Sequence, residues 1–594
     1  MTFKLCLVCP FALSGAHPVA EHVGGIATAL AGRGHRVTVL APSSSTQALR
    51  AGRRRLRQLA GGDAEALTAL AGEPLLVAVA PAVPVRQRGR RRGTGLPVAA
   101  RANVALAVRD GGFDVVHAHE PLLPGMAAAA LKYSPGLTAA TFHSRIEHAL
   151  PYPMRSATRE RRAANIDSLS ATSEQAAAVA GEVYPGDYLM IPPGIADVFA
   201  ERPGAQGIVA EWTTEGRAVT RALVKLVATT PGLELTLLWR RRGLRPIRPY
   251  LPAPARGRVH ALRPGDAAAR ADALAAAAVF VAMPEGDPDL AWEARAAGCA
   301  VVGPGSPEQP ALGYGPDQPA LAAAAAARAL DDPALRRELV EQAGPGVAER
   351  RFGAVAHRIE DEYRRIAARR RPVRRVAPAR TEILADLHMH TNHSPDCATD
   401  VEALLDHCIA EGLGAIAITD HNEVSGGLAA AAMDKPITII VGEEVKSSQG
   451  EVIGLFLHER IERGMSMAQT IAAIQDQGGL VYMPHPFDRM HTIPDPQTLL
   501  RSLDDLDVFE VYNARLLFDS FNADALRFAT KYNLIQAAGS DAHVLPGIGT
   551  ALNRIPAFDG PEEFMMAMRQ NVIERRPKSL LYLQSLKWMQ QVSR

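Results

Sequence analysis

The most informative stretch of the chain is Asp386-Leu387-His388-Met389-His390, in which a single residue separates two histidines. Further histidines and acidic residues recur downstream, several of them directly after short apolar runs such as 415–418 and 480–483. The candidate ligands are His388, His390, Asp396, His421, Glu444, His485, Asp541 and His543. Ligands at the C-terminal ends of successive strands are typical of a metal site in an α/β barrel. Mixed imidazole and carboxylate ligands suit zinc, iron or manganese, and clustered ions suit hydrolysis of phosphate esters.

The order of these ligands resembles that of the polymerase and histidinol phosphatase (PHP) superfamily, from residue 382 to the C-terminus. The resemblance implies a distorted (β/α)7 barrel with two or three divalent metal ions (Zn, Mn or Fe). It implies a first ion held by His388, His390, Glu444 and Asp541, a second by Asp396, His421 and His543, and a third by Glu444 with His485. Some members hold the third ion with a further histidine, where this chain has Asn513. A side-chain amide is a poorer ligand than imidazole, so we expect the third ion to be held most weakly.

Three more residues are assigned roles in this domain. Asp420 is expected to orient the ligands by hydrogen bonding. Arg489 and Arg515 are candidate phosphate clamps, because a guanidinium group binds phosphate with two parallel hydrogen bonds. For each arginine the alternative interpretation is a surface salt bridge.

Clustered ions lower the pKa of a bound water towards about 7 and stabilise charge on phosphate oxygens. The sequence therefore predicts metal-dependent hydrolysis of a phosphoester by residues 382–594. The stretches 442–445 and 450–456 look more like stand-alone PHP phosphoesterases than polymerase-attached domains. Those stand-alone members act on nucleotide phosphates or on the 5′ ends of short oligonucleotides. The predicted substrate is a phosphorylated small molecule or a short oligonucleotide.

The N-terminal part alternates strand and helix patterns. Residues 4–9, 37–41 and 114–118 are near-continuous apolar strands, and an amphipathic helix is expected at 22–31. This alternation indicates a doubly wound parallel sheet, and a second unit of the same kind spans about 207–344. The domains expected are 1–198, 199–368 and 382–594, with a basic, proline-containing linker at 369–381.

Four segments resemble the GT-B glycosyltransferases of the retaining phosphatidylinositol-mannosyltransferase kind. They are residues 34–42, residues 114–121 with 141–143, residues 173–174 with 191–194, and residues 285–298, in which Glu285 and Glu293 keep an E-x7-E spacing. The resemblance implies a pair of Rossmann-like domains that bind a UDP- or GDP-sugar donor and a lipid or polyol acceptor. The residues assigned to that binding are His119, Arg217, Glu285 and Glu293. An E-x7-E spacing also fits ordinary solvation of a helix.

The sequence departs from the GT-B pattern in two places. Ala16 and Pro18 stand where the family has a glycine pair, which permits close approach of the backbone to a phosphate. Residues 208–217 lack the usual lysine, which leaves Arg217 as the only cation there. Each missing charge-assisted hydrogen bond to a diphosphate costs about 1.5–3 kcal/mol. Three functions stay open: a phosphoesterase with a degenerate transferase half, an active transferase with an accessory PHP phosphatase, and a ligand-binding scaffold.

The composition of the whole chain excludes several classes. A net charge of +2 over 594 residues argues against an electrostatic nucleic-acid binder, and the arginine clusters are interpreted as solvated loops and linkers. Five scattered cysteines give no disulfide framework, and Cys6 and Cys9 lie in a predicted buried strand. The sequence has no apolar run of the roughly 18 residues that span a bilayer and no signal-peptide pattern. The chain is expected to be cytoplasmic.

Overall fold

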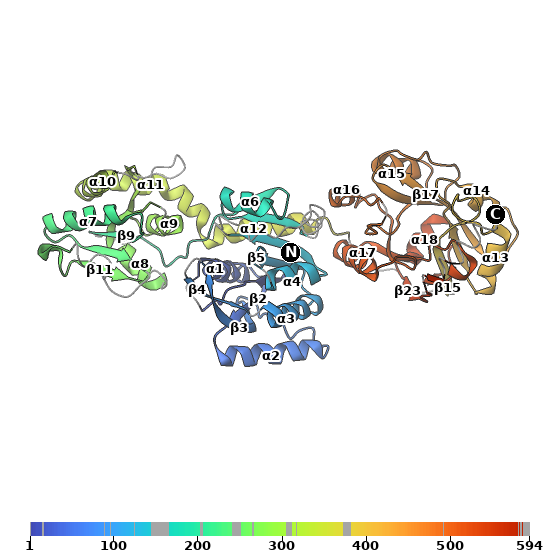
Figure 1. Cartoon of the computed structure of the whole chain (residues 1–594), viewed down its shortest axis with the longest axis horizontal. Helices are drawn as coiled ribbons and strands as arrows, with labels where there is room; N and C mark the ends of the chain where they lie inside the picture. The colour runs from blue at the N-terminus through green and yellow to red at the C-terminus, as the bar shows by residue number, and fades with distance from the viewer. Residues whose placement is uncertain are drawn as a thin grey trace. The chain divides into compact units, whose positions relative to one another are not determined.

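The computed structural model describes residues 2–585, apart from 15–16, 88–89, 96, 124, 144–165, 202–205, 240–250, 264–266, 285, 304–311, 316–317, 372–381, 491, 580 and 583–584. These residues fall into two compact units, Met1–Arg364 and Arg365–Arg594. Figure 1 labels many of their helices and strands. Most of the predicted linker lies outside the described residues, and the predicted domain boundaries stay predictions.

The first unit begins with an eight-stranded sheet of strand order β4-β3-β2-β1-β5-β6-β7-β8. Its strands are β1 (Lys4–Val8), β2 (Arg36–Ser43), β3 (Leu75–Gln87), β4 (Arg90–Gly95), β5 (Val115–His119), β6 (Leu137–Phe142), β7 (Ser168–Ala171) and β8 (Tyr188–Met190). Its helices are α1 (Pro18–Gly32), α2 (Thr46–Ala60), α3 (Pro97–Asp110), α4 (Met126–Tyr133) and α6 (Glu174–Gly181). All neighbouring strands are parallel except β3 and β4. Parallel strands need crossover helices, which accounts for the alternation in the sequence.

The same unit contains a six-stranded parallel sheet of order β11-β10-β9-β12-β13-β14. Its strands are β9 (Gly207–Glu211), β10 (Leu235–Leu238), β11 (Val259–Leu262), β12 (Ala277–Val281), β13 (Ala300–Gly303) and β14 (Leu312–Gly313). Its helices are α7 (Arg217–Thr229), α8 (Ala267–Ala275), α9 (Pro288–Ala296), α10 (Pro319–Asp331), α11 (Pro333–Arg350) and α12 (Phe352–Ala367). The predicted pair of Rossmann-like sheets is confirmed.

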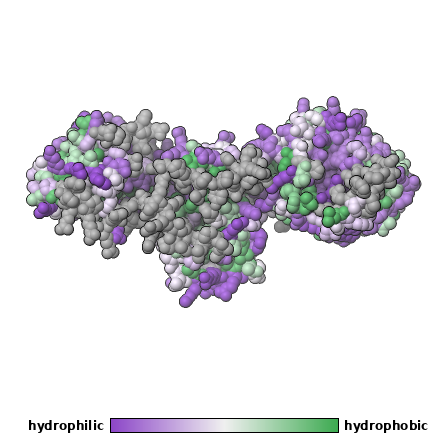
Figure 2. Space-filling view, in the orientation of Figure 1, coloured by the Kyte–Doolittle hydropathy of each residue, from purple (hydrophilic) through white to green (hydrophobic). Residues whose placement is uncertain are grey.

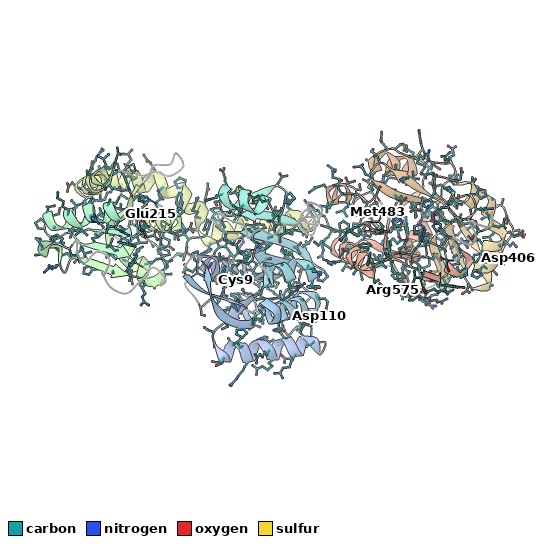
Figure 3. All side chains as sticks on the ribbon, in the orientation of Figure 1. Cys9, Asp110, Glu215, Asp406, Met483 and Arg575 are labelled. Atoms are coloured by element: carbon teal, nitrogen blue, oxygen red, sulfur yellow. The ribbon has the colours of Figure 1, made fainter. Side chains whose placement is uncertain are left out.

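Helix α12 returns to the first of these sheets. Its Tyr363 hydroxyl lies 2.7 Å from Nδ1 of His117 in β5, and Arg33 beside α1 donates a hydrogen bond to Glu360. Figure 3 places Cys9 inside this unit, and burial raises the pKa of its thiol to about 12. Cys6 is buried as well, as the predicted strand requires.

The second unit is built on a nine-stranded mixed sheet of order β21-β20-β19-β18-β17-β16-β15-β22-β23. Its strands are β15 (Glu382–Met389), β16 (Ala415–Ile418), β17 (Thr438–Ser447), β18 (Gly450–Leu455), β19 (Leu480–Met483), β20 (Val508–Asn513), β21 (Ile535–Gly539), β22 (Ala551–Pro556) and β23 (Val572–Arg575). Its helices are α13 (Val401–Ala410), α14 (Ser425–Ala431), α15 (Met467–Asp476), α16 (Pro496–Arg501), α17 (Asp519–Tyr532) and α18 (Gly560–Met568).

The sheet of the second unit curves until it nearly closes. Directly after β21, Met389 and Ala542 form a parallel bridge, and the Asp541 backbone N–H donates to the His388 carbonyl over 2.7 Å. The predicted distorted barrel is confirmed. Strands β17, β18 and β19 pair antiparallel inside it, because only two residues connect β17 to β18 and Gly450 (φ +134°) completes that tight turn.

The core of the barrel is apolar. One buried cluster contains Ala385, Leu387, Ile440, Tyr482 and Phe564. Figure 3 places Met483, the last residue of β19, within this unit. In the view of Figure 2 hydrophilic residues predominate on the described surface of the second unit. None of the helices in the described part of the chain combines the length and the apolar composition that crossing a membrane requires.

Candidate metal centre

Seven of the eight predicted ligands lie at the C-terminal ends of strands or shortly after them, and Glu444 lies within β17. His388 is in β15, and His390 and Asp396 follow it. The other ligands are His421 after β16, Glu444 in β17, His485 after β19, and Asp541 and His543 after β21. The C-terminal ends of parallel strands share one rim of a barrel, so the ligands meet there although 155 residues separate the first from the last (543 − 388).

Glu444 is at the middle of this group. Its Oε2 lies 3.0 Å from His421 Nδ1 and 3.5 Å from Nε2 of both His388 and His390. Its Oε1 lies 3.0 Å from His485 Nε2. One carboxylate therefore faces four imidazoles, the position expected of a ligand shared between ions.

Asp541 and Asp396 both lie close to His543, the remaining histidine of the group. Asp541 Oδ1 lies 3.4 Å from His390 Nε2 and 3.4 Å from His543 Nδ1. Asp396 Oδ2 lies 2.9 Å from His543 Nε2, and its Oδ1 lies 3.7 Å from His421 Nε2. The structure thus brings all eight predicted ligands together.

The donor set fits divalent ions. Nε2 of His388, Nε2 of His390 and Oε2 of Glu444 are buried, and they make no hydrogen bond to any described residue. Burying such groups without partners is costly, so three of them converging on one point indicate a charged ligand. His485 (φ 23°) and Asp541 (φ 52°) also adopt left-handed backbone conformations that non-glycine residues avoid. Strain of this kind is concentrated at functional sites.

The charges in this centre support one another. Burial acts to raise the pKa of Glu444, but His421 and His388 hold it well below its ordinary value. Burial likewise acts to raise the pKa of Asp541, and Arg515 and His388 hold it well below. Both carboxylates are therefore ionised at neutral pH and attract cations.

Asp420 accepts hydrogen bonds from the loop between His390 and Asp396. Its carboxylate accepts hydrogen bonds from the Thr391 backbone over 2.6 Å and from the Ser394 hydroxyl over 2.9 Å. The same Ser394 oxygen accepts from the His421 backbone N–H over 2.9 Å and lies 3.2 Å from His390 Nδ1. Ser394 therefore links Asp420 to two of the candidate ligands, His390 and His421.

Glu510, a buried carboxylate beneath the centre, is not among the residues predicted from the sequence. Its Oε1 lies 3.0 Å from His388 Nδ1 and accepts from the Tyr482 hydroxyl over 2.9 Å. Its Oε2 accepts from the His485 backbone over 2.8 Å and from Asn513 Nδ2 over 3.0 Å. The available signal was an acidic residue inside the apolar run 508–512, because a buried glutamate needs partners.

The two candidate phosphate clamps occupy different places. Arg515 Nη1 donates to Asp541 Oδ1 over 3.0 Å and lies 3.0 Å from His543 Nδ1. Arg489 instead lies 3.4 Å from Asp524 and over the ring of Phe521, both in α17. The structure brings Arg515 to the centre and places Arg489 against a helix.

In the first unit, His119 lies in a cluster of three histidines. Its Nδ1 is 3.0 Å from His143 Nε2, and the candidate ligand atoms of His22, His119 and His143 lie within 4.8 Å of one another. Nδ1 of His22 accepts a hydrogen bond from the Gly194 backbone, which places the proton of the neutral ring on Nε2. Burial lowers the pKa of His22 to about 4. A neutral ring with a proton on Nε2 is a donor there, not a metal ligand.

The other residues assigned to sugar-nucleotide binding are arranged less favourably. Glu293 accepts two hydrogen bonds from Arg270, over 2.7 and 2.8 Å, and Arg270 also bonds to Glu21 over 3.0 Å. Arg217 is exposed at the start of α7, and Glu285 lies outside the described residues. The carboxylate of Glu293 is therefore committed to an internal ion pair.

The chain matches three known domain families: Glycosyltransferase Family 4 over residues 19–197, PHP domain over 386–516, and PHP-associated over 519–573. Uncharacterized protein MJ1587 of Methanocaldococcus jannaschii is 34% identical over 141 residues, which are 22% of this chain and 82% of that protein. A phosphatidyl-myo-inositol mannosyltransferase of Mycolicibacterium smegmatis is 28% identical over 316 residues, which are 50% of this chain and 75% of that protein. A solved glycosyltransferase from Rickettsia africae covers 62% of this chain and 99% of its own, at 13% identity and a TM-score of 0.44.

Fold and centre define the second unit as an α/β barrel with a buried histidine and carboxylate site, the class that contains metal-dependent hydrolases. The second unit carries a PHP domain, and the first unit carries a Glycosyltransferase Family 4 domain. The chain also forms one family with MJ1587. The PHP domain indicates a hydrolase and the Family 4 domain indicates a transferase.

Proposed function

We propose that residues 382–594 hydrolyse a phosphoester with two or three divalent ions. The observation that carries this proposal is the convergence of eight ligand side chains on one rim, three of them with buried ligand atoms that make no hydrogen bond to any residue that the structure describes. This combination of imidazole and carboxylate donors suits zinc, manganese or iron. When bound, such ions lower the pKa of a water and stabilise charge on phosphate oxygens.

The protein's own residues divide the remaining work. His388, His390, Glu444 and the other ligands hold the ions in place. Asp420 and Glu510 fix ring orientations through the hydrogen bonds described above. Arg515 is within reach of the centre, and its guanidinium binds a phosphate group with two parallel hydrogen bonds.

The proposed substrate is a phosphorylated small molecule or a short oligonucleotide. Two exposed apolar side chains, Leu517 (61% exposed) and Phe518 (52% exposed), follow Arg515 closely in the chain. An exposed aromatic ring offers a stacking surface to a nucleobase, at about 1–3 kcal/mol per base. This arrangement supports a nucleotide over a simple sugar phosphate.

A direct experiment uses the full chain reconstituted with zinc, manganese or iron. We expect hydrolysis of an aryl phosphate, and faster hydrolysis of nucleotides or 5′-phosphorylated oligonucleotides. The double variant His388→Ala/His390→Ala removes two ligands and should reduce turnover to background. The matched control is His458→Ala, an exposed histidine outside the centre. Full activity of the double variant would show that the wrong centre was chosen.

Glycosyl transfer by the first unit is the second candidate. The Family 4 match and the mannosyltransferase relatives favour it, with a UDP- or GDP-sugar as donor and a lipid or polyol as acceptor. The pairing of Glu293 with Arg270 and the single exposed Arg217 argue for weak donor binding and slow transfer. Calorimetry of the full chain with UDP- and GDP-sugars tests this. Micromolar binding with rapid transfer, unchanged in Arg217→Ala, would make the first unit a working transferase.

A further inference from the structure

The second sheet of the first unit reverses its winding direction between β9 and β12. The strand order is β11-β10-β9-β12-β13-β14, so the chain winds outward from β9 on one side and from β12 on the other. Open parallel sheets bind their ligands at the carboxyl ends of the two strands that flank such a reversal. Here these ends lead into residues 212–216 before α7 and residues 282–287 before α9. A phosphate-bearing ligand of this sheet is therefore expected against the first turn of one of these helices.

Glu211, the last residue of β9, already places an anion at the start of α9. Its Oε2 accepts a hydrogen bond over 2.7 Å from the backbone N–H of Asp287, the N-cap residue of α9. The N-terminus of a helix carries roughly half a positive charge, which stabilises a carboxylate there. A Cβ atom on Gly286 would lie 3.0 Å from Oε2 of Glu211 and 2.8 Å from the carbonyl oxygen of Met283. Glycine at position 286 therefore leaves room for the carboxylate.

The two loops also contact each other directly. Thr213 Oγ1 donates to the carbonyl oxygen of Pro284 over 3.2 Å and accepts from the Gly216 backbone N–H over 2.9 Å. A Cβ atom on Gly216 would lie 2.8 Å from Sδ of Met283. Hydrogen bonding and packing therefore join the two loops at the place where a ligand of this sheet would bind.

The charge of these loops opposes a phosphate. Among the described residues of 211–217 and 282–289, the acidic side chains are Glu211, Glu215, Asp287 and Asp289, and the basic one is Arg217. Glu215, which Figure 3 labels, and Arg217 are both exposed. A diphosphate at the start of α9 would therefore face like charges, which repel it.

We propose that Glu211 determines which ligands the first unit accepts: its carboxylate occupies the phosphate position at α9 and thereby excludes nucleoside diphosphates and sugar nucleotides. The inference goes beyond the hydrolysis proposed for the second unit, and it rests on the weak donor binding proposed for the first. It assigns that weakness to one side chain of the protein itself. A single substitution at position 211 should therefore open the first unit to diphosphates.

Calorimetry of the full chain with GDP and UDP tests this proposal. EDTA in the buffer keeps the metal centre of the second unit from binding or hydrolysing the nucleotides. Glu211→Ala removes the carboxylate and frees the backbone N–H of Asp287, so we expect the Kd of at least one of the two nucleotides to fall at least about tenfold. Glu215→Ala removes an exposed glutamate of the same loop and is the matched control, which should bind as weakly as the unaltered chain.

Two further comparisons separate repulsion of phosphate from loosened packing. Guanosine and uridine lack phosphates, so Glu211→Ala should bind them no more tightly than the unaltered chain does. Inorganic pyrophosphate should compete with the bound nucleotide in this variant. Thermal unfolding checks that the variant folds. If it does not, Glu211→Gln replaces it, because glutamine keeps the size of the side chain and removes its charge, and a lower Kd than that of the unaltered chain is again expected.

Failure of the inference and failure of the weak donor binding give different results. An equal Kd in Glu211→Ala and the unaltered chain, or an equal gain in Glu215→Ala, would overturn the role of Glu211 and leave the weak donor binding intact. An equal gain for guanosine and uridine would also overturn it, because Glu211 would then exclude ligands by its size and not by its charge. Micromolar binding of GDP or UDP by the unaltered chain would overturn both.

Discussion

Glu444 in the second unit and Glu293 in the first unit are buried glutamates with contrasting surroundings. In the second unit, Glu444 faces four histidines whose ligand atoms converge, and two of those atoms, Nε2 of His388 and of His390, make no hydrogen bond to a described residue. In the first unit, Glu293 is closed off by Arg270, which is itself paired with Glu21. Converging atoms without partners indicate a missing ligand, whereas a completed ion pair indicates structure. Motif spacing alone, E-x7-E or H-x-H, does not distinguish the two.

The largest expected effect comes from Glu444. Glu444→Gln keeps the shape but removes the charge that faces four imidazoles. We therefore expect bound metal to fall to at most the one ion assigned to Asp396, His421 and His543, and turnover to fall to background. Metal analysis and phosphatase assays of the full chain measure this. Glu462→Gln, an exposed glutamate, is the control. Retention of metal and activity in Glu444→Gln would break the contrast between the units.

The ion pair in the first unit gives the next effect. Arg270→Ala leaves the buried Glu293 carboxylate without its partner, and breaking a buried pair costs about 3–5 kcal/mol. We expect the free energy of unfolding of the first unit to fall by that order. Denaturant unfolding followed by tryptophan fluorescence measures it, because Trp212, Trp239 and Trp292 belong to this unit. Arg337→Ala, which removes an exposed arginine, should change the stability little.

An unchanged unfolding free energy in Arg270→Ala would show that Glu293 is available to a ligand after all. Tighter binding of a GDP- or UDP-sugar by that variant would sharpen the same point, because it would make the ion pair a block to donor binding.

Acidification should also affect the first unit. Burial lowers the pKa of His22 to about 4, below the ordinary value of 6.5. Between about pH 6.5 and pH 4, His22 is protonated in the unfolded chain but neutral in the folded unit. The free energy of unfolding therefore decreases as the pH falls from about 6.5 towards 4. The expected loss is on the order of 3 kcal/mol from this residue. Unfolding at pH 7 and pH 4.5 should show a smaller difference for His22→Gln than for the unaltered chain, and an equal difference would refute the assignment.

The smallest expected effect concerns Glu510, which holds ligands of the metal centre in place by hydrogen bonds. Glu510→Gln keeps hydrogen bonding in part but removes the charge that faces His388 Nδ1. Outer residues of this kind typically contribute about 10–100-fold to metal affinity or activity. We expect a change in that range, with all ions still bound at saturating metal. Calorimetry at several metal concentrations decides, and a complete loss of ions would mean that Glu510 is a ligand.

The ligand positions could be predicted because several of them directly follow an apolar run. His388, His421 and His485 are close in sequence to a strand end, and a barrel collects strand ends on one rim. Glu510 was missed for a different reason. Its partner His388 lies on another strand, so only the neighbourhood of β20 and β15 reveals what Glu510 faces.

Local signals also set the limits of the predicted elements. The helix expected at 22–31 begins earlier, at Pro18, because proline suits a first helical turn and His17 caps it through Nδ1. The ion pair of Arg270 with Glu293 and Glu21 could not be foreseen, since 249 residues separate Arg270 from Glu21. The alternation of strands and helices follows from local sequence patterns and was predicted. Ion pairs between residues so far apart in the sequence can be identified only from the folded structure.

The near closure of the barrel has a consequence for biosynthesis. The bridge between Met389 and Ala542 joins the first ligand-bearing segment to the last. A ribosome must therefore translate beyond His543 before the nascent chain can assemble a complete centre, and contacts so distant in sequence form slowly. Polypeptides that end before β21 would carry six of the eight ligands. They would lack the segment with Asp541 and His543, which pairs with β15 and nearly closes the barrel. Premature termination anywhere in the last 50 or so codons before that point would leave an incomplete, metal-poor product.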